Sequence, residues 1–444
     1  MTLAHASPSP FGRLPDELVA HILEDVFLAS ILNRDTFATS TSLSSVCADR
    51  RWYRIARPIW LHTLYRRANL QEDLMVGLLL RPSVHPHVRS VHLYVLSWHL
   101  RYDLAAISQF PNLTSLSLVL WDEDEHDNFV FPAALSQGLQ QLPHLRSLDI
   151  SCGQGGEPFV LEDAEFNLGR HLPSLRRFTT ETCMCAGIWQ LLSSPTNLEA
   201  LQLSLAAEWR YSRVWEHVPF STLRSLDLSS DANGLPYIED LLSVLHKHIH
   251  PVSDYITQPL PLRALTFGYG AFEIPQPAGE ATDNASASML DMPRLSSLLE
   301  LLSSGGLRSL TLKFDDRVDW SMVSGSFDSI RELKLEGGTL HKYEQFRRLC
   351  HFVSLFPSLD FLRLEDPRFS ESELDQSRQL KRPVPPFDTP QFVARYPHLI
   401  SLLAFVRRSN VRYLGWTTYD SPSFMWARAE REEDFVMQSW SGSR

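Results

Sequence analysis

One short pattern of apolar residues recurs along most of this chain. It has the form L-x-x-L-x-L, in which Val, Ile, Phe or Trp sometimes replaces Leu. The two apolar residues of L-x-L lie on the same face of a strand, because successive side chains of a strand point to opposite faces. The copies begin at Val88, Leu113, Leu145, Leu175, Leu198, Leu223, Leu262, Leu307, Ile330, Leu359 and Val411. A chain with this pattern must bury one face of many short strands.

The segments between the copies predict what covers that face. Amphipathic stretches such as 238–248 and 295–303 precede some copies, and pairs such as Phe110-Pro111 and Phe356-Pro357 stand just before others. A proline there ends a helix and turns the chain toward the next strand. The copies are spaced irregularly, from 23 residues (307 to 330) to 52 residues (359 to 411). Repeated helix–turn–strand units bury their apolar faces only by stacking on their neighbours.

We therefore predict an α/β fold over residues 88–418, a leucine-rich-repeat solenoid with a curved parallel sheet inside and helices outside. Residues 271–293 and 366–390 interrupt the pattern and predict exposed, mobile loops. A doubly wound α/β domain is the alternative. That fold needs a glycine-rich phosphate turn or catalytic loops at the strand ends, and neither is apparent in the sequence.

The unpaired edge of the last strand of a solenoid must be covered. Residues 399–405 and 411–416 are apolar and are separated by only a short basic segment. We predict two closing strands here, followed by a loosely packed tail at 419–444. Residues 1–11 predict a disordered tail, and residues 68–87 a connecting helix or linker.

The N-terminal block, residues 12–67, has a different periodicity. Leu14-Pro15-Asp16-Glu17 predicts a helix start, since proline suits the first turn and acidic residues suit the positive end of the helix dipole. Apolar residues then recur at helical spacing, and a second such stretch covers 43–60. The block predicts two or three short helices, too few to be comfortably stable alone.

The order and spacing of several residues in this block resemble an F-box. These residues are Leu14, Pro15, Glu17, Leu18, Ile22, Leu23, Val46, Cys47, Trp52 and Trp60. The resemblance implies that they dock on a Skp-type adaptor and, through it, on a cullin–RING ubiquitin ligase. The closing Arg412-Tyr413-Leu414-Gly415-Trp416 is similar to fungal F-box proteins with degenerate repeats. The alternative is a helical cap that packs on the next domain.

Composition excludes several classes of partner. The 444 residues carry a formal net charge of −11, which disfavours nucleic acid and anionic membrane surfaces. No stretch approaches the roughly 18 apolar residues of a membrane span, and the N-terminus lacks the features of a signal peptide. Five irregularly spaced cysteines indicate a reducing compartment. We expect a protein of the cytoplasm or nucleus.

The sequence contains no recognisable catalytic motif. Cys183-x-Cys185 is too short a pair for a zinc site, and 122–127 lacks the glycine and closing Glu of a calcium loop. His246 and His250 have the spacing of a metal pair on a helix, but no third ligand is suggested, so a solvated helix end is favoured. We expect a non-catalytic chain without metal or cofactor.

The third, fifth and seventh residues of each copy predict the exposed face of the sheet. They are small and hydroxyl-bearing in the first half, and charged with an aromatic in the second. Arginine and aromatic residues dominate binding hot spots. We therefore place a target-protein site at Thr311, Lys313, Glu332, Lys334, Glu336, Phe361, Arg363 and Glu365. With the F-box resemblance, this predicts a ubiquitin-ligase substrate receptor; the alternative is a repeat scaffold without a ligase link.

Overall fold

The computed structural model describes the strands, helices and turns of the repeats in most detail. The described residues are 14–22, 51, 54–55, 62–66, 82–83, 85–96, 105, 107–121, 138–152, 159–160, 168–184, 197–205, 218–229, 238–250, 259–267, 292–313, 320–336, 343–365, 404–406, 408–418, 421–428 and 435–439. The chain divides into two compact units. The first unit comprises residues 1–125 and 132–156, and the second comprises 126–131 and 157–444.

The first unit contains a short helical segment and parallel strands. Residues 16–22 are helical. The strands are β1 (Thr63–Arg66), β2 (Ser90–Leu96), β3 (Ser115–Trp121) and β4 (Ser147–Cys152), with a 3-10 turn, η2 (His85–His87), before β2. Neighbouring strands run parallel, and equivalent positions of the repeated pattern lie opposite each other. Val91 thus pairs with Leu116, and Leu116 with Leu148. These three side chains are fully buried.

Strand β1 corrects the predicted extent of the helical block. The sequence placed residues 12–67 in that block, but Thr63–Arg66 form a strand that pairs with β2, with Leu64 opposite Val91. An uncovered edge of β2 would leave a row of backbone groups unpaired, and β1 satisfies them. This pairing depends on a neighbouring strand about 27 residues away (63 to 90), which local periodicity does not reveal.

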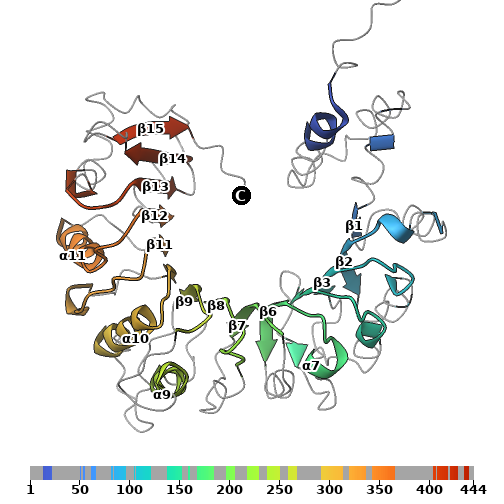
Figure 1. The fold of residues 1–444 in the computed structure, drawn as a ribbon, viewed down its shortest axis with the longest axis horizontal. Coiled ribbons are helices and arrows are strands. Elements are labelled where there is room, and N and C mark those ends of the chain that lie inside the picture. Colours follow the sequence, from blue (N-terminus) through green and yellow to red (C-terminus); the bar gives the residue numbers. More distant parts are fainter. Residues whose placement is uncertain are drawn as a thin grey trace, which may run out of the picture. The chain divides into compact units, whose positions relative to one another are not determined.

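The second unit continues the same architecture. Its parallel strands are β5 (Phe159–Val160), β6 (Arg177–Met184), β7 (Ala200–Leu205), β8 (Ser225–Ser229), β9 (Ala264–Phe267), β10 (Ser309–Lys313), β11 (Glu332–Glu336), β12 (Phe361–Glu365) and β13 (Tyr413–Thr418). The helical elements are α7 (Leu168–His171), α9 (Ile238–Ile249), α10 (Met292–Ser304), η5 (Trp320–Met322) and α11 (Tyr343–Ser354). Helices α9, α10 and α11 lie on one side of the strands (Figure 1).

The core of the second unit lies between the strands and those helices. Leu310, Leu333, Leu362 and Leu414 occupy the same register position on four neighbouring strands and are fully buried. Aromatic side chains fill the space behind them, with the Trp320 and Phe352 ring centroids 4.4 Å apart. The predicted α/β leucine-rich-repeat fold is thus confirmed, because each of the eleven copies of the pattern forms a strand.

The C-terminal closure differs from the prediction. Residues 404–406 are helical, so the strand predicted over 399–405 is wrong at its described end; 399–403 lie outside the described residues. The predicted loose tail contains β14 (Ser421–Arg428) and β15 (Phe435–Ser439), which extend the sheet antiparallel from β13. The meander covers the edge of β13 that a terminal repeat would otherwise leave open.

Several other predicted boundaries fall mostly on residues outside the description. These are the tail at 1–11, most of the linker at 68–87, and the loops at 271–293 and 366–390. Helix α10 begins at Met292, so the last two residues of the predicted first loop, 292 and 293, are helical. The helices predicted over 238–248 and 295–303 are confirmed as α9 and α10.

Candidate functional site

The predicted target-binding residues come together on one face of strands β10 to β13. The parallel register places Thr311 beside Lys334, Lys334 beside Arg363, and Arg363 beside Gly415. Neighbouring strands of a sheet lie about 4.8 Å apart, so this row brings two cationic side chains next to each other. Residues 23 to 29 positions apart in the sequence (311 to 334, and 334 to 363) are therefore direct neighbours. We call this surface the sheet face.

A second row on the sheet face is acidic at one end and aromatic at the other. Glu332 pairs with Phe361, and Phe361 with Tyr413. The two aromatic rings have centroids 6.3 Å apart, and Tyr413 is 44% exposed. The sequence analysis missed Tyr413 because it considered target contacts only up to the copy at Leu359. Its position as third residue of the last copy was the signal that could have identified it.

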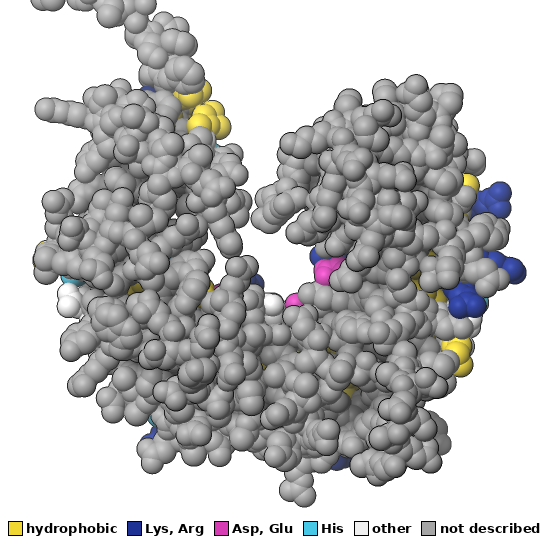
Figure 2. Space-filling model, turned by 180° about the vertical axis from the view of Figure 1, so that it is seen from behind, with side chains coloured by type: hydrophobic (Ala, Val, Ile, Leu, Met, Phe, Trp, Pro, Cys, Tyr) yellow, Lys and Arg dark blue, Asp and Glu magenta, His cyan; other side chains and the backbone are white. Residues whose placement is uncertain are grey.

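The third row on the sheet face contains both basic and acidic side chains. Lys313 pairs with Glu336, and Glu336 with Glu365. Lys334 and Glu336 form an ion pair at 2.6 Å, with their side chains 30% and 24% exposed. Figure 2 shows acidic and basic side chains together on the surface of the C-terminal repeats. The sheet face thus offers mixed charge beside aromatic surface, a composition suited to a protein partner.

The N-terminal helical segment starts as the sequence predicted. The amide of Val19 donates to the carbonyl of Pro15 at 3.1 Å, which is the first helical hydrogen bond. Asp16 accepts hydrogen bonds from Arg51 Nε at 2.7 Å and from Arg54 Nη2 at 2.9 Å. The hydrogen bond from Arg51 lowers the pKa of Asp16 below its usual value of 3.8. Arg51 also donates to the carbonyl of Leu14. These contacts hold Arg51 and Arg54 against the start of the helix.

The same helix exposes part of its apolar surface. Leu18 is 50% exposed and Ile22 is 43% exposed, whereas Val19 is fully buried. Leu18 and Ile22 are four residues apart and so lie on one helix face. Figure 2 shows hydrophobic side chains at the surface of this N-terminal segment. Glu17 and Pro15 are also exposed.

Half of the residues that carry the F-box resemblance fall outside the part of the chain that the structure describes. Leu23, Val46, Cys47, Trp52 and Trp60 lie outside the described residues. We call the exposed pair Leu18 and Ile22 the apolar helix face.

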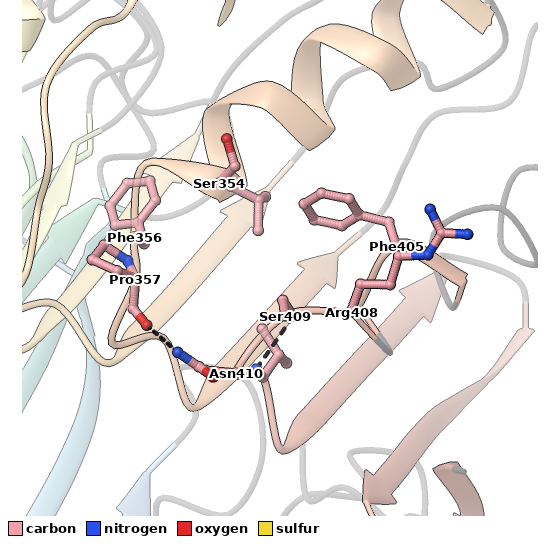
Figure 3. Close-up of a pocket in the computed structure, with 9 residues that line it drawn as sticks. Ser354, Phe356, Pro357, Phe405, Arg408, Ser409 and Asn410 are labelled. Atoms are coloured by element: carbon pink, nitrogen blue, oxygen red, sulfur yellow. Dashed lines mark hydrogen bonds between the residues drawn. The ribbon is translucent and has the colours of Figure 1, made fainter. Parts of the chain in front are cut away.

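A shallow pocket lies where α11 meets the start of β13 (Figure 3). The Phe405 ring points toward Ser354, and the Asn410 side chain donates to the carbonyl of Pro357 at 2.7 Å. The amide of Val411 donates to Ser409 Oγ at 3.3 Å. Because these contacts join one repeat to the next, we interpret the pocket as part of the repeat packing.

The described residues offer no metal or membrane site. No group of three or more His, Cys, Asp or Glu within them is arranged to hold a metal ion. The rings of His246 and His250 lie 4.9 Å apart at the end of α9, without a third ligand among these residues. No helix in the described part of the chain is long and apolar enough to cross a membrane.

Comparison with known proteins identifies similar solved structures but no family. No protein-family model matches the chain, and no curated protein matches it. A chain in the crystal structure of a TLR13–ssRNA13 complex is 13% identical with a TM-score of 0.32, over 68% of this chain and 41% of that chain. A chain in the crystal structure of the Rad7 and Elc1 complex in yeast is 15% identical with a TM-score of 0.35, over 82% and 84%. This chain thus spans less than half the length of the TLR13 chain.

Proposed function

We propose that this protein is a substrate receptor of a Skp–cullin–RING ubiquitin ligase. In this proposal the N-terminal segment binds a Skp-type adaptor, and the sheet face binds a target protein. The observation that carries the proposal is the apolar helix face, where Leu18 and Ile22 are exposed within a segment that resembles an F-box. The protein would act in the cytoplasm or nucleus and would perform no chemistry itself.

The energetics of the apolar helix face favour a partner. Full burial of a Leu or Ile side chain contributes about 1.5–3 kcal/mol, and about half of each side chain is still exposed here. Adjacent exposed apolar residues on one helix mark an interaction surface more often than isolated ones do. The Asp16–Arg51 contact fixes the start of the helix, so the adaptor would meet a preformed face.

The sheet face supplies the second interface of the proposal. Arg363, Phe361 and Tyr413 are of the residue types that contribute most to binding energy at protein interfaces. Lys334 and Glu336 already pair with each other, so a partner could exchange this ion pair for complementary charges of its own. The target would be a folded or extended protein segment with both charged and apolar side chains.

Capture of the adaptor tests the first interface. Leu18→Asp and Ile22→Asp place charges in the apolar helix face, and we expect each to reduce capture of a purified Skp-type adaptor at least tenfold. Met322→Asp is the matched control, because Met322 is an exposed apolar residue (45%) on the repeats. Equal capture by the two N-terminal variants and by Met322→Asp would favour the alternative, a repeat scaffold without a ligase link.

Capture of targets tests the second interface. We expect charge reversal at Lys334 together with Arg363 to remove proteins that the wild-type chain captures when the proteasome is inhibited, while adaptor capture persists. Asp149→Arg on β4 changes the charge on the repeats of the first unit. If Asp149→Arg removes the captured proteins and the double reversal does not, the target site lies on the N-terminal repeats instead.

A further inference from the structure

The second residue of the repeated pattern is an arginine in most copies. It stands just before each strand, at the edge of the sheet where the strands begin. In the second unit these residues are Arg176, Glu199, Arg224, Arg263, Arg308, Arg331, Asp360 and Arg412. All six arginines are exposed, and the two acidic residues are half-buried.

Backbone hydrogen bonds place these residues side by side. The amide of Arg263 donates to the carbonyl of Arg224 at 2.8 Å, the amide of Arg308 to Arg263 at 3.0 Å, and the amide of Arg331 to Arg308 at 2.8 Å. Strands β8 to β11 follow one another in the sheet (Figure 1). The four arginines therefore form an unbroken row, with about 4.8 Å between neighbours. We call this row the arginine edge.

Among the described residues, carboxylates pair with Arg331 at one end of the row and with arginines beyond the row, but not with its other three members. Arg176 pairs with Glu199, while Arg331 and Arg412 lie 3.8 Å and 3.6 Å from Asp360. Among the described residues, no ion pair involves Arg224, Arg263 or Arg308. The guanidinium of Arg263 donates to the carbonyl of Gly306 at 3.0 Å.

This arrangement is unfavourable for the isolated chain. Like charges on directly adjacent strands destabilise a sheet. The row also concentrates positive charge on a protein whose formal net charge is −11. A ligand that neutralises the arginines would remove the repulsion, so the row favours binding of an anion.

We propose that the arginine edge binds a short acidic segment of a partner polypeptide. The row spans three strand spacings, about 14 Å, which matches about four residues of extended chain. Glu199 and Asp360 flank the row and pair with arginines, so uncompensated positive charge does not continue past either end among the described residues. The negative net charge opposes a long polyanion such as nucleic acid. The row therefore suits a compact cluster of Asp and Glu side chains.

This surface is separate from the sheet face. The arginine edge uses the second residue of each copy, whereas Lys334 and Arg363 are the fifth residues of theirs. Binding at the edge therefore does not depend on the proposed adaptor or target interfaces.

Fluorescence anisotropy with labelled peptides tests the proposal on the full chain. The probe is a hexaglutamate peptide, and hexaglutamine is the neutral comparison. We expect the triple variant Arg224→Gln/Arg263→Gln/Arg308→Gln to weaken hexaglutamate binding about tenfold or more, since three charge pairs are lost together. We also expect binding to weaken as salt is raised. The matched control, Arg89→Gln/Arg146→Gln/Arg347→Gln, removes the same charge from exposed arginines outside the row.

Retention of binding within about twofold in the control would support the proposal, together with a melting temperature of the triple variant at or above that of the wild-type chain, since the substitutions remove repulsion between neighbouring arginines. Equal loss in the two triple variants would overturn it, because net charge alone would then account for the binding. Absence of hexaglutamate binding to the wild-type chain at low salt would also overturn it. So would tighter binding of a six-nucleotide single-stranded DNA that the triple variant loses, because that result would assign the edge to nucleic acid.

Discussion

Gly415 on β13 lies directly beside Arg363 on β12, and the Arg363 side chain covers the space that a Cβ atom at position 415 would occupy. A Cβ built on Gly415 would lie 3.2 Å from Cγ of Arg363 and 3.6 Å from its Cβ. The glycine therefore lets the arginine stem lie across β13, next to Phe361 and Tyr413. The orientation of Arg363 on the sheet face depends on this missing side chain.

Gly415→Ala should move Arg363 without unfolding the repeats. The alanine Cβ requires the Arg363 stem to shift by a few tenths of an ångström, and the arginine is flexible enough to do so. We expect target capture to fall severalfold while the melting temperature changes by less than about 2 °C. Binding of captured proteins, measured beside Arg363→Ala, checks this. Full capture by Gly415→Ala together with loss in Arg363→Ala would show that the orientation of Arg363 is unimportant.

A side-chain hydrogen bond joins the last repeat to its neighbour. Asn410 donates to the carbonyl of Pro357 at 2.7 Å, and Asn112 makes the corresponding bond to Pro86 at 2.8 Å. Asn410→Ala should lower the free energy of unfolding of the second unit by about 1 kcal/mol, the usual contribution of one such bond. Chemical denaturation checks this. Ser358→Ala is the control, because Ser358 is an exposed residue of the second unit at the same place in its copy; an equal loss there would contradict the role of the bond.

The carboxyl group of Asp149 should make the stability of the first unit depend on pH. Burial raises the pKa of Asp149 above its usual value of 3.8, although a 2.9 Å hydrogen bond from Ser117 favours the charged form. The folded state thus holds this proton more tightly than the unfolded state does. Protonated Asp149 therefore stabilises the folded state at low pH. This contribution is lost as the pH rises from 3.8 through the raised pKa.

Asp149→Asn removes the charge that the folded state disfavours. We expect it to raise the melting temperature at pH 7 by about 2 °C, the effect of about 1 kcal/mol, and to lose that advantage below pH 3.8. Scanning calorimetry across pH checks this. Ser117→Ala should have the opposite sign at pH 7, because it removes the hydrogen bond to the carboxylate. A melting-temperature difference that is the same at every pH would contradict the assignment.

Much of the fold could be predicted because the repeated pattern shows directly which residues are buried. Leu310, Leu333 and Leu362 alternate with polar residues, and a strand has only two faces, so their burial follows from the pattern. The same alternation placed Lys334 and Arg363 on the opposite face of the strands, where both are half-buried. The helical start at Asp16 could be predicted as well, because capping chemistry is local.

Other features depended on residues that are far apart in the sequence. Strand β14 pairs with the edge of β13 that would otherwise stay open, and β15 pairs with β14, whereas a local stretch of sequence does not show that this edge needs a partner. Strand β1 likewise pairs with the edge of β2. Local propensity does not determine how an edge is covered, because several kinds of segment can do it.

The repeated pattern predicts the strands of the repeats, their buried face and the residue at each repeat position. Which of these residues become neighbours depends on how the strands pair in the folded chain. Arg224, Arg263 and Arg308 are separated by 39 and 45 residues (224 to 263, and 263 to 308), and they become neighbours only because β8, β9 and β10 pair in register. The physical reason is that burial is encoded residue by residue, whereas proximity arises from the hydrogen bonds between strands.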